Sequence, residues 1–160
     1  MSNNTLAGVN LTNNDSSAQF TLGQEFTDHD GKRYRYVKVL NETATVAGAA
    51  GDAVAYLGSP TDGDEDNTVV TDNTDAATKP VCAGLLQVAV TGATGTAEYV
   101  WVQTGGQATT NQTLAGSPAD GDALFLSTTD LTLTLSTAAD DPVCAYAVDA
   151  SADKIRLNCV

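Results

Sequence analysis

Short stretches of apolar residues run along the chain from Phe20 onward, and turn sequences separate them. Residues 33–40 (RYRYVKVL) and 97–104 (AEYVWVQT) are rich in aromatic and β-branched side chains, which strands prefer. In residues 131–135 (LTLTL), leucine and threonine alternate with the period of a strand. Asp-Gly and Gly-Gly pairs recur between these stretches, and no window carries a helical stripe. The pattern predicts an all-β fold, either a β-sandwich or a barrel-like fold.

The beginning of the chain differs from the rest. Residues 1–17 are polar and show no hydrophobic period. We therefore predict a flexible N-terminal arm over residues 1–17, followed by one all-β domain over residues 18–160. A fully extended arm of this length would span about 50 Å, which is enough to reach a neighbouring subunit.

Two short strings occur twice in the same order. Gly-Asp-Ala stands at 51–53 and 121–123, and Pro-Val-Cys-Ala stands at 80–83 and 142–145. This repetition indicates an internal duplication of a few strands, in units of roughly 31–92 and 97–160. We expect the Pro to begin a strand and the Val and Cys to enter the core. Cys82 and Cys144 are thus interpreted as reduced, buried thiols at equivalent positions, with a disulfide between them as the alternative and a metal-binding or nucleophilic role as the least expected.

The chain is strongly acidic. It has 7 Lys+Arg against 20 Asp+Glu, a formal net charge of −13. Such a charge repels nucleic acid and anionic membranes, and no stretch is long enough to cross a bilayer. The first residues lack the basic and apolar regions of a signal peptide. We expect a protein made in the cytoplasm, with neither nucleic acid nor membrane as partner.

Candidate catalytic and cofactor chemistry is sparse. The single histidine, His29, stands in a turn without an adjacent nucleophile and is interpreted as solvated. The acidic stretch 62–66 resembles the start of a calcium-binding EF-hand loop, but Asn67 and Asn73 occupy the positions that need Gly and Glu. A solvated loop is the default there and calcium the alternative. Residues 90–95 (VTGATG) lack the lysine of a phosphate-binding loop. We expect no enzyme and no cofactor.

Positive charge is concentrated in one stretch. Four of the seven cations lie within seven residues, interleaved with two tyrosines. In so acidic a protein this favours a partner protein with surface carboxylates over nucleic acid. An edge strand protected by charge is the alternative. The candidate contact residues are Lys32, Arg33, Tyr34, Arg35 and Lys38.

Three parts of the chain resemble a known family in order and character: residues 31–38, the small-residue run that leads to 51–53, and residues 99–106. They are similar to small virion proteins of tailed bacteriophages, the capsid decoration or cement proteins. The likeness covers roughly 20–160, and the doubled unit and the acidic loop depart from it. The resemblance implies a β-rich protein of the virion that binds the major capsid protein on the outer surface of an assembled head, often as a trimer. It carries over no catalytic residue.

Two functions follow as hypotheses. The leading one is a phage capsid decoration protein that stabilises the head by bridging capsid subunits. The alternative is a ligand- or carbohydrate-binding module on a virion or cell surface, with exposed aromatic residues as its platform. Its candidates are Tyr34, Tyr36 and Trp101, although the alternation around Trp101 favours a core position. A hydrolase is disfavoured because the chain has one histidine and no recognisable triad.

Overall fold

The computed structural model describes residues 5–6, 9–57, 67–76 and 80–159. Its elements are β1 (Thr5–Leu6), β2 (Val9–Asn10), β3 (Glu25–Thr27), β4 (Arg33–Val39), β5 (Ala53–Tyr56), β6 (Thr68–Val70), η2 (Asn73–Asp75), β7 (Cys82–Leu86), β8 (Glu98–Thr109), β9 (Ala123–Leu126), β10 (Leu133–Leu135), β11 (Ala145–Asp149), η3 (Ala150–Ala152) and β12 (Lys154–Asn158). The predicted all-β class is confirmed. No helix among the described residues is long and apolar enough to cross a membrane.

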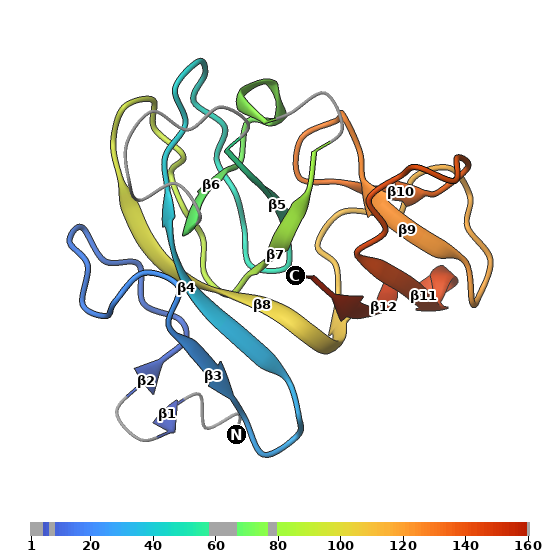
Figure 1. Ribbon diagram of the computed structural model, residues 1–160, viewed down its shortest axis with the longest axis horizontal. Coiled ribbons are helices and arrows are strands. Elements are labelled where there is room, and N and C mark those ends of the chain that lie inside the picture. Colours follow the sequence, from blue (N-terminus) through green and yellow to red (C-terminus); the bar gives the residue numbers. More distant parts are fainter. Residues whose placement is uncertain (1–4, 7–8, 58–66, 77–79, 160) are drawn as a thin grey trace.

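Five strands close into a barrel, on the left in Figure 1. Going around it, the order is β4, β8, β7, β5 and β6, and β6 runs parallel to β4 while the other neighbours are antiparallel. The alternation of β4 turns Val37 and Val39 into the barrel, where they meet Val54, Val69 and Val100. All five are fully buried. Burying such side chains is worth about 1.5–3 kcal/mol each, so this valine core is the main stabilising element of the barrel.

A second unit extends from the far half of β8, on the right in Figure 1. The last five residues of β8 pair with β12, and β11, β9 and β10 follow in that order. A parallel bridge from Ala115, just after β8, to Thr134 in β10 links the end of this sheet back to its beginning. Its core is built of leucines and an isoleucine: Leu114, Leu124, Leu126, Leu133, Ile155 and Leu157. Because β8 spans both units, it fixes one relative to the other.

The topology of the two units shows the duplication that the repeated strings predict. The order β6-β5-β7-β8 in the first unit returns as β10-β9-β11-β12 in the second, with every pair antiparallel. The turn before each Gly-Asp-Ala strand is also repeated. Gly51 and Gly121 both have a φ of 92°, and the following aspartate accepts a 2.8 Å bond from the backbone N–H three residues earlier in each case. Only glycine adopts that φ without strain.

The repeated Pro-Val-Cys-Ala string places its Cys in the core but not its Val. Cys82 and Cys144 are buried, as expected, and all three cysteines are free thiols. Val81 and Val143, however, are 39% and 40% exposed. The prediction that they enter the core is wrong, because neighbouring residues of an extended chain point to opposite sides.

The N-terminal segment also departs from its prediction. Val9 and Leu11 are buried against Tyr36 and Trp101 on the outside of the barrel. Further along, Asp15 forms an antiparallel bridge with Tyr99 of β8. The predicted flexible arm over 1–17 is therefore wrong for residues 9–17, which are part of the packed structure. Residues 1–4 and 7–8 lie outside the described residues.

Candidate functional site

The five predicted contact residues do not form one surface. Strand alternation on β4 places Arg33 and Arg35 on the same side as Val37 and Val39, which point into the barrel. Tyr34 and Lys38 point to the opposite side, where the N-terminal segment packs on β4 and Phe26 of β3 stacks on Tyr34. The basic strip read from the sequence is thus divided between two faces of the same strand.

Tyr34 is a packing residue. Only 5% of it is exposed, its ring stacks on Phe26 with the centroids 6.1 Å apart, and its hydroxyl donates to Asp28 Oδ2 at 3.3 Å. Burial and the nearby Asp28 carboxylate raise the pKa of Tyr34 to about 12. The prediction that Tyr34 contacts a partner is therefore corrected.

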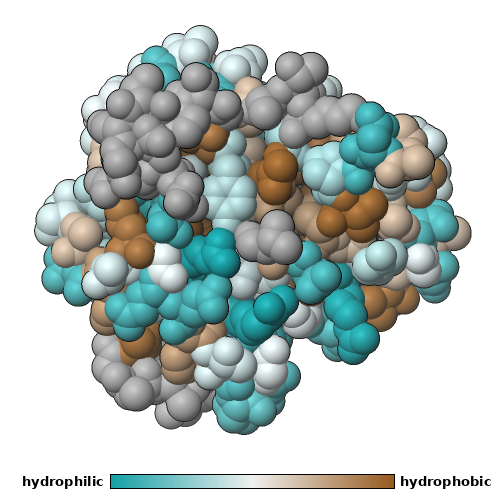
Figure 2. All heavy atoms as spheres, in the orientation of Figure 1, coloured by the Kyte–Doolittle hydropathy of each residue, from teal (hydrophilic) through white to brown (hydrophobic). Residues whose placement is uncertain are grey.

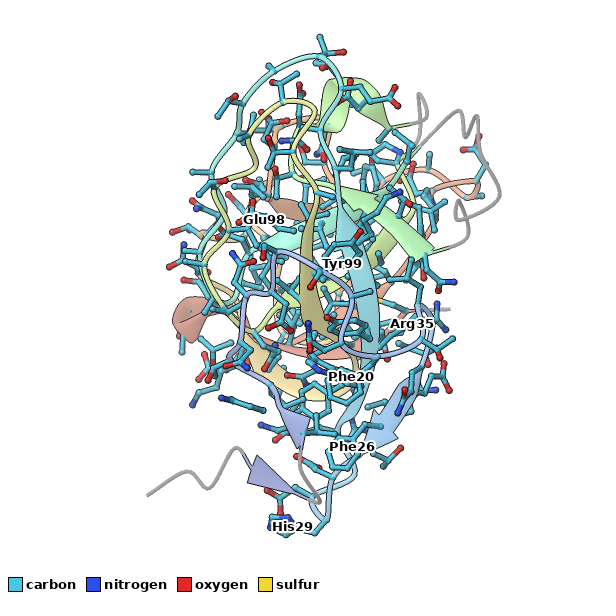
Figure 3. All side chains as sticks on the ribbon, turned by 90° about the vertical axis from the view of Figure 1, so that its left-hand side faces the viewer. Phe20, Phe26, His29, Arg35, Glu98 and Tyr99 are labelled. Atoms are coloured by element: carbon cyan, nitrogen blue, oxygen red, sulfur yellow. The ribbon has the colours of Figure 1, made fainter. Side chains whose placement is uncertain are left out.

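The aromatic platform of the carbohydrate-binding alternative is buried as a whole. Tyr36 and Trp101 are 0% and 1% exposed and pack on each other and on Phe20. Figure 3 shows Phe20 and Phe26 along the outer side of β4. The expectation that Trp101 lies in the core is confirmed, and none of the three proposed aromatics offers an exposed ring to a sugar.

Arg35 is held by neighbours within the chain. Its guanidinium forms an ion pair with Glu25 at 2.9 Å and donates to the Tyr56 hydroxyl. These partners join β3, β4 and β5, and Figure 3 labels Arg35 beside β4. Because its donors already serve this network, Arg35 acts as a structural residue.

Lys32 and Arg33 gain two basic neighbours from the end of the chain. Arg33 pairs with Gly105 of β8, and Gln107 of the same strand pairs with Arg156 of β12. Gly105 has no side chain, and a Cβ there would lie 2.5 Å from Arg33 Nε, so the arginine lies directly over β8. A surface hollow between Asp30, Lys32, Gly106, Gln107 and Arg156 connects these groups, and an adjacent hollow includes Lys154.

We call this surface the basic face, defined as Lys32, Arg33, Gln107, Tyr146, Val148, Lys154 and Arg156. It holds four of the seven cations of a chain with a net charge of −13. Asp30 and Asp149 lie next to it, and the Asp28 carboxylate accepts from the Lys32 N–H at 2.9 Å, so the four cations have at least three acidic neighbours. Figure 2 shows hydrophilic side chains gathered over β3, β4 and the adjoining part of β8.

The basic face also contains exposed apolar groups. Tyr146 and Val148 of β11 are 48% and 41% exposed, and Tyr146 lies directly across from Arg156 in the β11–β12 pair. Tyrosine and arginine are the side chains that most often dominate binding energy at protein interfaces. The combination of cations with exposed tyrosine and valine side chains suits a protein partner.

Sequence reasoning missed Lys154 and Arg156. The sequence does indicate that their side chains point outward, since Ile155 and Leu157 alternate with them and face the core. Their proximity to Lys32 has no signal in the sequence, because more than one hundred residues separate them. It depends on the pairing of β12 with β8.

Two candidates from the sequence remain, His29 and the acidic stretch 62–66. His29 lies at the tip of the β3–β4 turn, where Figure 3 shows it pointing away from the barrel, and its contact is with the exposed Asp30 at 3.2 Å. The suggested calcium loop at 62–66 lies outside the described residues. The chain matches no protein-family model, and neither a curated protein nor a solved structure matches it. Function is therefore inferred from the basic face and from the chemistry of the chain.

Proposed function

We propose that this protein is a phage capsid decoration protein that binds the major capsid protein on the outside of an assembled head, through the basic face. The observation that carries the proposal is the collection of four cations, Tyr146 and Val148 on one side of an otherwise acidic body. Such an arrangement recognises a surface that presents carboxylates.

The charge distribution sets both orientation and selectivity. A body of net charge −13 is repelled by most acidic surfaces, whereas the basic face is attracted to them. Binding therefore occurs in one orientation, with the acidic remainder facing solvent. Nucleic acid is a poorer partner, because each phosphate contact needs a cation and the acidic body repels the rest of the polymer.

Stabilisation of the head follows from linkage. A protein that contacts two neighbouring capsid subunits binds the assembled lattice and not the free subunits, so its binding energy favours assembly. As the resemblance implies, we propose that the protein acts as a homo-oligomer, with a trimer favoured, on the virion surface. An oligomer would present several basic faces at once and bind more tightly than one chain.

Mass spectrometry of purified virions tests this function. We expect the chain in virions of the phage that encodes it, in a fixed ratio to the major capsid protein, and we expect its loss to make heads break at a lower temperature. Absence of the chain from washed virions, or its recovery only with the packaged DNA, would contradict the proposal. The carbohydrate-binding alternative finds no support in its candidate aromatics, which are buried.

A further inference from the structure

The three cysteines of the chain, far apart in sequence, meet in the core between the two units. Cys82 begins β7 in the first unit, Cys144 precedes β11 in the second, and Cys159 follows β12. They are 1%, 4% and 5% exposed. The three Sγ atoms lie within 4.8 Å of one another, and those of Cys82 and Cys159 are 3.8 Å apart. We call these residues the thiol triad.

We propose that the thiol triad is a binding site for a thiophilic metal ion, of the class of Zn²⁺ or Cu⁺, which joins the two units. Thiolates bind such ions at about 2.3 Å, so two sulfurs on one tetrahedral ion are about 3.8 Å apart. The triad already has nearly the dimensions of a ligand triangle. Small side-chain movements would close this triangle around an ion.

One cation near the triad suits the charge that a metal–thiolate group would carry. Three thiolates and a divalent ion sum to one negative charge, and Arg33 donates at 3.4 Å to the side chain of Asn158, the residue before Cys159. A guanidinium nearby makes a buried anion less costly than an isolated one.

A cysteine binds metal as its thiolate. When the ion binds, the three thiols release their protons to solvent and no electron is transferred.

The site would act as a cross-link. Cys82 belongs to the first unit and the other two cysteines to the second, so an ion held by all three resists separation of the units. In a reducing compartment, where disulfides do not persist, a metal serves this purpose while the cysteines stay reduced. This inference stands independently of the proposed capsid binding, because it concerns stability.

Cd²⁺ titration of the reduced, chelator-treated full-length protein provides the test. We expect a sulfur-to-cadmium charge-transfer absorption that saturates at one ion per chain and a higher unfolding temperature. Zn²⁺ or Cu⁺, added separately to the metal-free protein, should also raise the unfolding temperature. In the wild type, bound Cd²⁺ should protect all three thiols from alkylation, a readout that needs no variant.

Single substitutions Cys82→Ala, Cys144→Ala and Cys159→Ala should each weaken Cd²⁺ binding at least about tenfold. The matched control is Ile155→Val, which removes a methylene from the same buried cluster without touching a sulfur and should bind Cd²⁺ like the wild type. The proposal would be overturned by any one of four results: no charge-transfer band, unchanged binding by Cys82→Ala, no effect of either Zn²⁺ or Cu⁺ on the unfolding temperature, or fewer than three reactive thiols after unfolding without reductant.

Discussion

Glu98, at the start of β8, shows how single residues hold loops to this barrel. Its carboxylate accepts hydrogen bonds from Asn14 Nδ2 at 2.6 Å, from the Thr91 hydroxyl at 2.9 Å and from the Gly92 N–H at 2.9 Å. Figure 3 places Glu98 beside Tyr99 on the side covered by the N-terminal segment. Burial raises the pKa of Glu98, but these bonds outweigh it and the net pKa is lowered.

The lowered pKa of Glu98 predicts a pH-dependent contribution to stability. A free glutamate has a pKa of about 4.3, so the contribution is complete above that pH and is lost as the pH falls through the lower folded-state value. At pH 7 we expect Glu98→Gln to reduce the free energy of unfolding by about 1–3 kcal/mol, since one carboxylate oxygen becomes an NH2 group and the donors that face it lose their acceptor. The control is Glu25→Gln at an exposed position, which should lower the free energy of unfolding by about 1 kcal/mol or less. Equal effects of the two variants in urea unfolding would refute this role.

At the scale of elements, the duplicated turns differ in one respect. Asp52 and Asp122 both accept the backbone N–H three residues earlier at 2.8 Å. Asp52 also accepts from Asn111 at 2.8 Å and from Gln112 at 3.2 Å, which ties the turn of the first unit to the segment that follows β8. The first turn thus joins the two units, while the second turn repeats its local bond.

This difference predicts unequal effects of the same substitution. We expect Asp52→Ala to lower the free energy of unfolding by about 1–3 kcal/mol, because it leaves two side-chain amides without their acceptor. Asp122→Ala loses the turn bond at a half-buried site and should lower the free energy of unfolding by about 0.5–1.5 kcal/mol. Chemical denaturation of both variants measures the difference. A larger loss for Asp122→Ala would mean that Asp52 does not join the units.

Because the N-terminal segment is packed on the barrel, its deletion should have effects that deletion of a free arm would not have. Removing residues 1–17 uncovers Tyr36 and Trp101, so we expect a lower unfolding temperature and a red-shifted Trp101 emission. Removing residues 1–4 leaves Val9 and Leu11 in place and should change neither value. A deletion of residues 1–17 that unfolds like the full-length protein would show that the segment adds nothing to the barrel.

The sequence predicts much of this fold, and its errors have identifiable causes. Turn sequences and alternation predict the strands, and the repeated strings predict the duplication that the topology shows. Two apolar residues, Val9 and Leu11, are too few to reveal a period among polar neighbours, so the N-terminal segment is misread as an arm. Val81 is misplaced because composition alone does not tell which residue of Val-Cys faces inward.

For the whole molecule, the candidate sites depend on contacts that no local pattern contains. The sequence points to the basic stretch of β4, but alternation divides that stretch, and the pairing of β12 with β8 adds Lys154 and Arg156. The thiol triad is equally non-local, since it brings together residues 82, 144 and 159. Closure of the units around β8 creates both features.

Capsid binding by charge-reversed protein tests the central claim most directly. Wild-type protein and the double variant Lys154→Glu/Arg156→Glu would be sedimented with assembled capsids of the phage that encodes the chain, at low and at high salt. Both side chains are exposed, so the fold should persist. We predict at least about a tenfold loss of affinity for the variant and weaker wild-type binding at high salt. The control Lys38→Glu, on the other side of β4, should bind like the wild type. Undiminished binding by the double variant, or a loss as large in the control, would contradict the assignment of the basic face.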